Sequence, residues 1–540
     1  MSMNDPIARG LAAGWRVTDA STLTSNQTAE ADVVVIGTGA GGGTTAEILA
    51  RQGLAVILVE EGRLYYQKDF KMDELTSYAN LYQEGMSRTT ADGAIAILQG
   101  RCVGGSTTVN WTSSFRTPDE TLTYWSRQFG LDGLAPDAMA PWFQGREERH
   151  TMAPWQTEPN LNNDILRQGC EKLGYSWQVI PRNVKGCWNS GYCGVGCPTN
   201  AKQGALLTTI PGALDNNARL YHGLRADKLV MNQDRIDHLQ ASAMGPDGVT
   251  PSGVTVTLKA RHFVIAASAI GSPGLLLRSQ LPDPYQRVGK RSFIHPVNAT
   301  VARMPANVDP FYGAPQSIYS DQFNFSQGVD GPVGYKLEVP PLHPAMAAGV
   351  VPGHGPDQLA DLSQLPRMQS VIALLRDGFH EQSPGGTVTL RDDGSPALDY
   401  PVTDYLWQGI RQAYLHMAEI QFAAGAEAVR AMHLDSTWYK TWAEARAAIA
   451  ELPMKPHRAR LFTAHQMGGC SMGSNPEDSV VNGFGEHHQV ANLSIHDASI
   501  FPTSIGANPQ LSVYALAARN STRLAQKLSS TVNWTRGFPE

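Results

Sequence analysis

Three glycines with a phosphate-binding spacing follow a short β-branched run. Gly37, Gly39 and Gly42 form G-x-G-x-x-G directly after ADVVVI at 31–36. In this arrangement the first glycine makes the turn, the second lets the backbone approach a pyrophosphate, and the third lets a helix pack on a strand. Glu60 lies 21 residues after Gly39, where a carboxylate can accept a hydrogen bond from a ribose hydroxyl. The pattern predicts a dinucleotide site, with a glycine-rich turn without ligand as the alternative.

Three of the six cysteines form a second group that could do chemistry. Cys187, Cys193 and Cys197 fall within eleven residues, in the loop CWNSGYCGVGCP. Thiolates in a flexible loop can wrap a soft metal or an iron–sulfur cluster. Zinc is a further candidate, although Zn²⁺ prefers four ligands. The alternative is a structural loop of reduced thiols, or a pair that oxidises.

The elements that must position these groups alternate between strand and helix. The run 31–36 reads as a buried strand, 44–52 as a helix that Gly53 stops, and 55–60 as a second buried strand. This βαβ unit predicts an α/β fold with a parallel sheet. Further strands are expected at 261–267 and 492–497, and a long helix from about 509 to 528.

The chain of 540 residues is long enough for several structural lobes. Residues 1–30 are polar, lack a sustained period, and read as an N-terminal arm. Between 298 and 405 prolines and glycines are frequent, and alternation such as GTVTL at 386–390 predicts antiparallel strands in a second, mixed region.

The charge balance argues for a small-molecule function. Lys and Arg number 43 against 49 Asp and Glu, a net charge of −6, which gives no basic footprint for nucleic acid or an anionic membrane. No run approaches the ~18 apolar residues of a transmembrane segment. The first residues lack the apolar core of a signal peptide, so a cytoplasmic location is expected.

Several longer segments carry a family resemblance over nearly the whole length from Ala31. They are VILVEEG at 56–62, GRCVGGSTTVNW at 100–111, HFVIAASAIGSPGLLLRS at 262–279, AHQMGGCSMG at 464–473 and NLSIHDASIFPTSIGANPQLSVYALAAR at 492–519. Together with the glycine motif they resemble the glucose–methanol–choline (GMC) family of flavoprotein oxidoreductases. The resemblance implies a Rossmann-like FAD-binding domain and a second, mixed substrate domain built on an antiparallel sheet. The FAD-binding domain is expected to be discontinuous, over 31–110, 198–290 and 465–540, and the substrate domain with the cysteine loop to cover 111–197 and 291–464.

The resemblance also implies a catalytic pair. His465 occupies the position of the family's catalytic histidine and Asn508 that of its partner. Alcohol oxidation needs a base near the hydroxyl, and an imidazole with a pKa near ~6.5 can take that proton while flavin N5 takes the hydride. Asn508 cannot titrate, so its expected role is to hold the reacting oxygen. His295 in FIHPV matches a structural position of the family, and a satisfied core histidine is the alternative for His465.

The same resemblance implies the cofactor contacts. The helix after Pro509 would point its positive end at the flavin and stabilise its anionic reduced form. Some relatives attach FAD through a histidine at the position of Val109, so FAD is expected to be non-covalent here. The expected contacts, beyond the glycine motif and Glu60, are Gly104, Gly105, Ser106, Asn110, Trp111, Asp497, Ala498 and Pro509.

The cysteine spacing resembles two kinds of relative. In catalytic subunits of bacterial FAD-dependent glucose dehydrogenases three cysteines hold a [3Fe-4S] cluster. The loop also resembles, less closely, a segment of long-chain alcohol oxidases, and NWTSSFRTP at 110–118 favours those enzymes. The expected function is therefore an FAD-dependent alcohol oxidoreductase that oxidises a CH–OH donor to a carbonyl and acts as a dehydrogenase, with the cysteine loop as the exit for electrons. They would pass to an external acceptor such as a cytochrome c, and a periplasmic location is expected only if the chain is exported with a partner.

Several alternatives stay open at this point. An O₂-using alcohol oxidase would release hydrogen peroxide, a flavin-retaining hydroxynitrile lyase would leave the flavin oxidised, and a non-catalytic FAD-binding electron carrier would tolerate loss of His465. Sugar, sterol, aromatic and fatty alcohols are all candidate substrates. Their pocket is expected around 111–116, 298–345 and 400–465, with Trp111, Phe115, Tyr319 and Phe323 as candidate lining residues.

Overall fold

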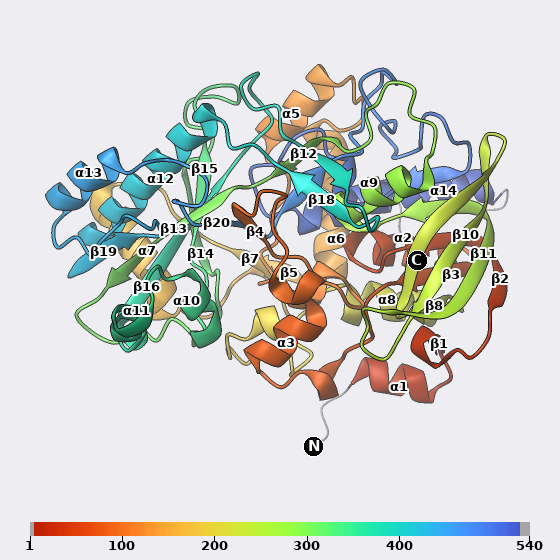
Figure 1. Ribbon diagram of the computed structural model, residues 1–540, viewed down its shortest axis with the longest axis horizontal. Helices are drawn as coiled ribbons and strands as arrows, with labels where there is room; N and C mark the ends of the chain where they lie inside the picture. Colours follow the sequence, from red (N-terminus) through yellow and green to blue (C-terminus); the bar gives the residue numbers. More distant parts are fainter. Residues whose placement is uncertain (1–4, 530–540) are drawn as a thin grey trace.

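The computed structural model describes residues 5–529 and is organised around two large sheets (Figure 1). Strands β1, β8, β3, β2, β11 and β22 of the first sheet run parallel, and β10 and β9 continue from β11 as an antiparallel meander. The bounds along this sheet are β1 (Arg16–Asp19), β8 (Arg219–His222), β3 (Val56–Glu60), β2 (Gln27–Ile36), β11 (Pro251–Ile265), β22 (Leu493–Ile495), β10 (Arg235–Met244) and β9 (Leu224–Asn232).

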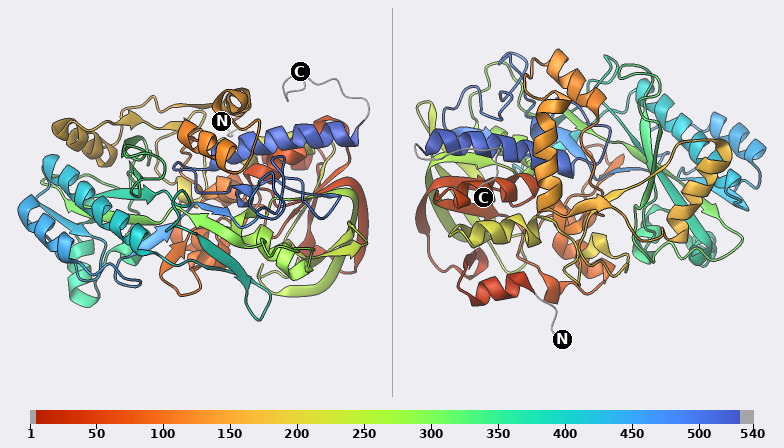
Figure 2. Two further views of the ribbon diagram at one scale, coloured as in Figure 1. Left: turned by 90° about the horizontal axis from the view of Figure 1, so that it is seen from above. Right: turned by 180° about the vertical axis from the view of Figure 1, so that it is seen from behind.

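Helices from distant parts of the chain cover this sheet. Helix α14 (Gln510–Leu528) packs against α2 (Ala40–Arg51) and α6 (Pro136–Arg149), and α2 also contacts α8 (Thr209–Leu214). Figure 2 shows α14, near the C-terminal end, lying along the N-terminal part of the fold. Helix α9 (Ser268–Ser279) contacts β9. Both ends of the described chain therefore contribute to one layered unit.

The second large sheet is mostly antiparallel and has the order β4-β20-β13-β16-β15-β14-β6, with β19 also on β13. A four-stranded sheet, β18-β17-β12-β21, is separate from it. The bounds are β4 (Ile95–Ile97), β20 (Leu461–Thr463), β13 (Val297–Arg303), β16 (Met368–Leu375), β15 (Tyr335–Glu338), β14 (Ile318–Phe323), β6 (Gln178–Val179), β19 (Ala428–Ala431), β18 (Pro396–Asp399), β17 (Gly386–Leu390), β12 (Lys290–Ile294) and β21 (Gln466–Gly468).

Three of the remaining helices, α7 (Leu161–Leu173), α12 (Asp404–Ala423) and α13 (Trp442–Glu451), pack on strands of the second large sheet. Helix α12 packs on β13 and β16 and contacts α7 and α13. The others are α1 (Pro6–Ala12), α3 (Glu74–Leu81), α4 (Ser106–Val109), α5 (Asp119–Gln128), α10 (Pro344–Val350) and α11 (Gly355–Leu362), and a two-stranded sheet joins β5 (Met152–Pro154) to β7 (Pro181–Asn183).

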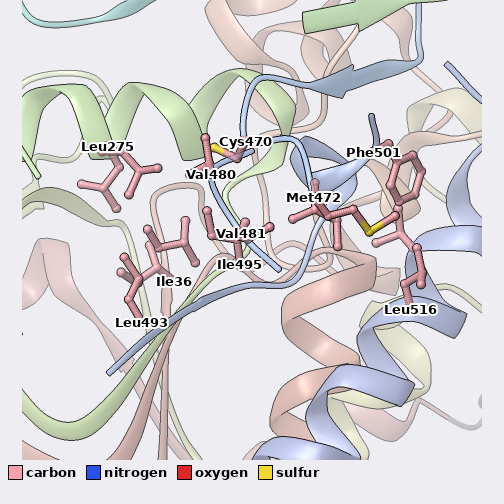
Figure 3. Close-up of a cluster of buried hydrophobic side chains, with 14 of the residues drawn as sticks. Ile36, Leu275, Cys470, Met472, Val480, Val481, Leu493, Ile495, Phe501 and Leu516 are labelled. Atoms are coloured by element: carbon pink, nitrogen blue, oxygen red, sulfur yellow. The ribbon is translucent and has the colours of Figure 1, made fainter. Parts of the chain in front are cut away.

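A buried apolar cluster supports the strand ends beside the glycine motif (Figure 3). Ile36 at the end of β2 packs near Leu493 and Ile495 of β22, and Leu275 reaches the cluster from α9. Leu516 extends the cluster to α14. Since the turn at Gly37 follows Ile36 directly, this packing fixes the place from which the turn starts.

The predicted α/β fold is confirmed, and the structure specifies the elements at its start. The expected strands at 31–36 and 55–60 are β2 and β3, and the helix begins at Ala40 rather than Thr44 because Gly39 has an extended backbone and ends the turn there. The expected arm over 1–30 forms α1 and then β1, which pairs with β8 and extends the first sheet.

The domain boundaries at 110, 198, 290 and 465 stay predictions. β4, inside the expected 31–110 segment, pairs with the second sheet through β20. Across residues 5–529, no helix is both long and apolar enough to span a bilayer.

Candidate active site

A cavity of about 1210 Å³ is lined by residues of both large sheets. It brings together residues that lie far apart in the sequence. Of the predicted site residues it is lined by Gly37, Gly39, Glu60, Gly105, Ser106, Asn110, Trp111, His465, Asp497, Ala498, Asn508 and Pro509. Gly42 and Gly104 do not line the cavity. They lie in the two glycine segments whose other residues do.

The glycines leave a cradle that a side chain would fill. Gly37 has a φ of +103°, and a Cβ there would lie 2.2 Å from the carbonyl oxygen of Ala266. A Cβ on Gly105 would lie 2.9 Å from Cα of Gly39, so the two glycine segments approach each other closely. Gly42 lets α2 pack on the turn, because its Cβ would lie 1.9 Å from the Gly37 carbonyl oxygen. This bare backbone at a helix N-terminus fits the diphosphate of a dinucleotide.

Glu60 is tied to both glycine segments through a residue that the sequence motif did not single out. The Thr38 hydroxyl donates to Oε2 of Glu60 over 2.6 Å, and the Gly62 N–H donates to Oε1 over 2.9 Å. The Gly104 N–H donates in turn to the Thr38 hydroxyl over 3.0 Å. Burial raises the pKa of Glu60 to about 7. The carboxyl therefore anchors the loops as well as facing the cavity.

Asp497 holds neighbouring backbone in place. One carboxyl oxygen accepts from the Ser268 N–H over 2.9 Å and from the Ser272 hydroxyl, and the other accepts from the Ser499 N–H over 2.8 Å. These bonds join the end of β22 to the start of α9. The contact between Asp497 and the flavin stays a prediction. The hydrogen bonds of Asp497 to the neighbouring backbone do not depend on that contact.

His465 meets His295 because two strands pair. β12 and β21 are antiparallel with Ile294 opposite Gln466, which places the next residues side by side. The two Nδ1 atoms lie 3.0 Å apart, and the backbone N–H of Gly506 donates to Nε2 of His295 over 3.2 Å. Burial lowers the pKa of His465 to about 4 and that of His295 well below its ordinary value. Both rings are therefore neutral at pH 7.

Asn508 is held by a buried carboxyl. Its Nδ2 donates to Oε2 of Glu338 on β15 over 3.3 Å, which leaves a second amide hydrogen for a ligand. Glu338 is fully buried, and burial raises its pKa to about 7. No sequence motif marked Glu338, because a lone glutamate in an alternating strand carries no functional signal.

Gln510, at the first turn of α14, links the chain next to Asn508 to the segment that follows Gly104 and Gly105. Its Oε1 accepts from Nδ2 of Asn110 over 2.8 Å, and its Nε2 donates to the Ser113 carbonyl over 2.7 Å. The start of α14 is thereby fixed against the segment that precedes Trp111. No sequence motif marks this glutamine, although it lies next to Pro509.

Apolar side chains of β13, β16 and β20 line one part of the cavity, together with the polar Ser370 of β16. β13 and β20 lead to the histidine pair, since Val297 lies opposite Phe462. The apolar residues in this part of the lining include Val297, Ala299, Val301, Leu342, Met346, Val350, Ile372, Leu374, Met432, Leu461 and Phe462. Of the four aromatic residues expected in the pocket, Trp111 lines it, but the other three do not. Phe115 and Tyr319 pack against each other instead, with ring centroids 4.8 Å apart.

The metal site at the cysteine loop stays a prediction. Within residues 5–529 no three or more His, Cys, Asp or Glu side chains are placed to hold a metal ion. Each thiol has a separate polar neighbour: Cys187 accepts from the Asn189 N–H, Cys193 from Arg182, and Cys197 contacts the Thr199 hydroxyl. The geometry thus gives no support for zinc or a [3Fe-4S] cluster at Cys187, Cys193 and Cys197.

The loop has a visible structural role instead. Nζ of the buried Lys202 donates to the carbonyls of Cys193, over 2.7 Å, and of Asn110, over 2.6 Å. Gly194 lies against the Trp111 indole, where a Cβ would come within 3.1 Å of the ring. The loop therefore braces the segment that lines the cavity.

A Gly-rich dinucleotide cradle that opens beside a buried histidine and an asparagine defines the class of a dinucleotide-dependent oxidoreductase. The sequence comparisons specify the family. The GMC oxidoreductase family matches residues 78–297 with its N-terminal part and residues 382–517 with its C-terminal part. The chain belongs to the GMC oxidoreductase family, and the glycine cradle fits the FAD cofactor that this assignment supports.

Individual relatives agree with the family. A GMC-type oxidoreductase of Mycobacterium tuberculosis, described as uncharacterized, is 31% identical over 90% of this chain and 74% of its own length. A long-chain-alcohol oxidase of Arabidopsis thaliana is 28% identical over 90% of this chain and 67% of its own length. A formate oxidase variant of Aspergillus oryzae shares the fold, with a TM-score of 0.70 at 15% identity over 94% of this chain and 99% of its own.

Proposed function

We propose that the protein oxidises an aliphatic alcohol to a carbonyl compound with non-covalently bound FAD. The observation that carries this is the set of apolar side chains that line the cavity from β13, β16 and β20, the strands that lead toward His465. The long-chain-alcohol oxidases among the relatives support the same substrate class. FAD, when bound, supplies the hydride acceptor. Val109, where some relatives attach FAD through a histidine, offers no group for a covalent link.

Each site residue has a separate role in the proposed reaction. His465 accepts the hydroxyl proton at Nε2, which has no protein partner within residues 5–529 and belongs to a side chain that lines the cavity. Asn508 donates its free amide hydrogen to the reacting oxygen and holds it in place. Gly37, Gly39, Gly105 and Glu60 hold the dinucleotide, with Ser106, Asn110, Trp111, Asp497, Ala498 and Pro509 along the rest of the cavity.

We further propose molecular oxygen as the electron acceptor. A dedicated acceptor such as a cytochrome c is the alternative, and it would be favoured by a cluster in the cysteine loop. The relatives with an assigned activity are named as oxidases. An O₂-using enzyme needs no protein partner for its turnover.

The direct test is anaerobic reduction of the flavin by candidate alcohols. We expect linear alcohols of about eight to sixteen carbons to bleach the flavin absorbance and glucose to leave it unchanged. On admission of air, hydrogen peroxide should appear in stoichiometric amounts with the carbonyl product. Bleaching by glucose alone would contradict the substrate class, and turnover with a dye but no peroxide would contradict the acceptor. If no alcohol bleaches the flavin, a hydroxynitrile lyase becomes the better explanation.

The pH dependence of flavin reduction follows from the buried histidine. A base acts only when unprotonated, and burial lowers the pKa of His465 to about 4. We expect the rate of flavin reduction to be flat from pH 8 to about pH 5 and to fall about tenfold per pH unit below pH 4. Glu338, with a pKa of about 7, is the neighbouring group that could add a step near neutrality. The profile should therefore be measured in the wild type and in Glu338→Gln; an inflection near pH 6.5 in both contradicts the prediction.

A further inference from the structure

The hydrogen bonds of His295 decide which of its nitrogens carries a hydrogen. The backbone N–H of Gly506 lies 3.2 Å from Nε2 of His295, and a backbone N–H can only donate. Nε2 of His295 is therefore an acceptor. Because His295 is fully buried and neutral, its hydrogen is on Nδ1.

The state of His295 fixes that of His465. The two Nδ1 atoms are 3.0 Å apart, which leaves room for one hydrogen between them. Since His295 supplies that hydrogen, Nδ1 of His465 must accept it. A neutral His465 then carries its own hydrogen on Nε2, the nitrogen without a protein partner.

We infer that His295 is a positioning residue that holds His465 in the Nε2–H tautomer in the resting enzyme. The inference deepens the proposed function, on which its meaning for catalysis rests. The resting site then presents two donors to a ligand oxygen, the N–H of His465 and the free amide hydrogen of Asn508. Such a pair is complementary to an alkoxide or a carbonyl oxygen more than to a neutral hydroxyl.

Proton acceptance requires the opposite arrangement of the pair. His465 must carry its hydrogen on Nδ1 and donate it to His295, so that Nε2 has a free electron pair. The substrate O–H bond then breaks as an N–H bond forms at Nε2, and His465 becomes an imidazolium. In that arrangement Nε2–H of His295 opposes the Gly506 N–H, so one hydrogen bond is lost. We expect this base-competent form to be populated roughly ten- to a hundredfold less than the resting form.

Two substitutions of similar polarity separate the tautomer role from mere packing. Asparagine at position 295 places its amide at the same number of bonds from the backbone as Nδ1, and that amide can either donate to or accept from His465. Glutamine places its amide where Nε2 lies, so it keeps the Gly506 bond but leaves Nδ1 of His465 without a partner. We expect flavin reduction to be at least about tenfold faster in His295→Asn than in His295→Gln, with similar KM. Equal losses in the two variants would indicate packing alone and overturn the inference.

A spectroscopic measurement tests the tautomer without any turnover. In ¹⁵N-histidine-labelled wild-type holoenzyme, the ¹⁵N shifts distinguish protonated from unprotonated ring nitrogens, and the signals are assigned by their loss in His295→Gln and His465→Gln. We expect Nδ1 protonated in His295 and Nε2 protonated in His465. A protonated Nδ1 in His465 of the resting enzyme overturns the inference. This result does not depend on whether an alcohol reduces the flavin, so a failure of the proposed function is recognised separately.

Discussion

Replacement of His465 with alanine is expected to lower the rate of flavin reduction by an alcohol by about 10²–10⁴-fold, because the proposed proton acceptor is lost. FAD should stay bound, since the glycine cradle and Glu60 lie on other elements. The measurement is stopped-flow reduction of the purified holoenzyme under anaerobic conditions. A rate within threefold of the wild type would remove His465 from the mechanism.

The matched control for this variant is another histidine in a polar environment. His238 on β10 interacts with Asp237 through Nδ1 and does not line the cavity. His238→Gln should leave both flavin content and reduction rate unchanged. A comparable loss of activity in this control would show that the effect of His465→Ala is not specific to the site.

The second large effect is expected from Gly37→Ala. The φ of +103° disfavours any residue with a side chain, and the new Cβ would lie 2.2 Å from the main-chain oxygen of Ala266, which cannot move aside without shifting β11. We expect at least a tenfold lower ratio of bound FAD to protein, read from the flavin absorbance of the purified chain. Full flavin content in this variant would contradict the cradle.

The variant Gly53→Ala measures the cost of backbone strain without the steric overlap that Gly37→Ala introduces. Gly53 also has a positive φ, +79°, but a Cβ there would meet nothing within 4 Å. The expected cost is about 1–2 kcal/mol of stability, with flavin content unchanged. Thermal unfolding of the two variants therefore gives the strain alone in Gly53→Ala and the strain plus steric overlap in Gly37→Ala.

The sequence identifies this fold well wherever one element follows another along the chain. The βαβ unit could be predicted because a β-branched run, a glycine turn and a helix stop are all local signals. The pairing of β1 with β8 could not, since Arg16–Asp19 has no apolar alternation and gains its place only from a partner some 200 residues later.

In the candidate site, too, residues marked by local sequence could be predicted, whereas those placed by distant contacts could not. His465 and Asn508 were reachable because each lies in a recognisable segment. Glu338 and the orienting role of His295 were not, because they depend on strand register and on a single backbone N–H at Gly506. The cysteine spacing could not decide between a metal site and a structural loop, since spacing along a loop does not fix where thiols point. Arg182, Asn189 and Thr199 each engage a different sulfur.

The completion of the first sheet by β22 and of its helical cover by α14 has a consequence for biosynthesis. The ribosome makes the glycine turn well before it adds Leu493–Ile495 and Gln510–Leu528. Until then the nascent polypeptide lacks Asn508 and the strand beside β11, so cofactor loading has to be a late event. Products of premature termination would accordingly be released without flavin, and we expect them to be cleared by proteases.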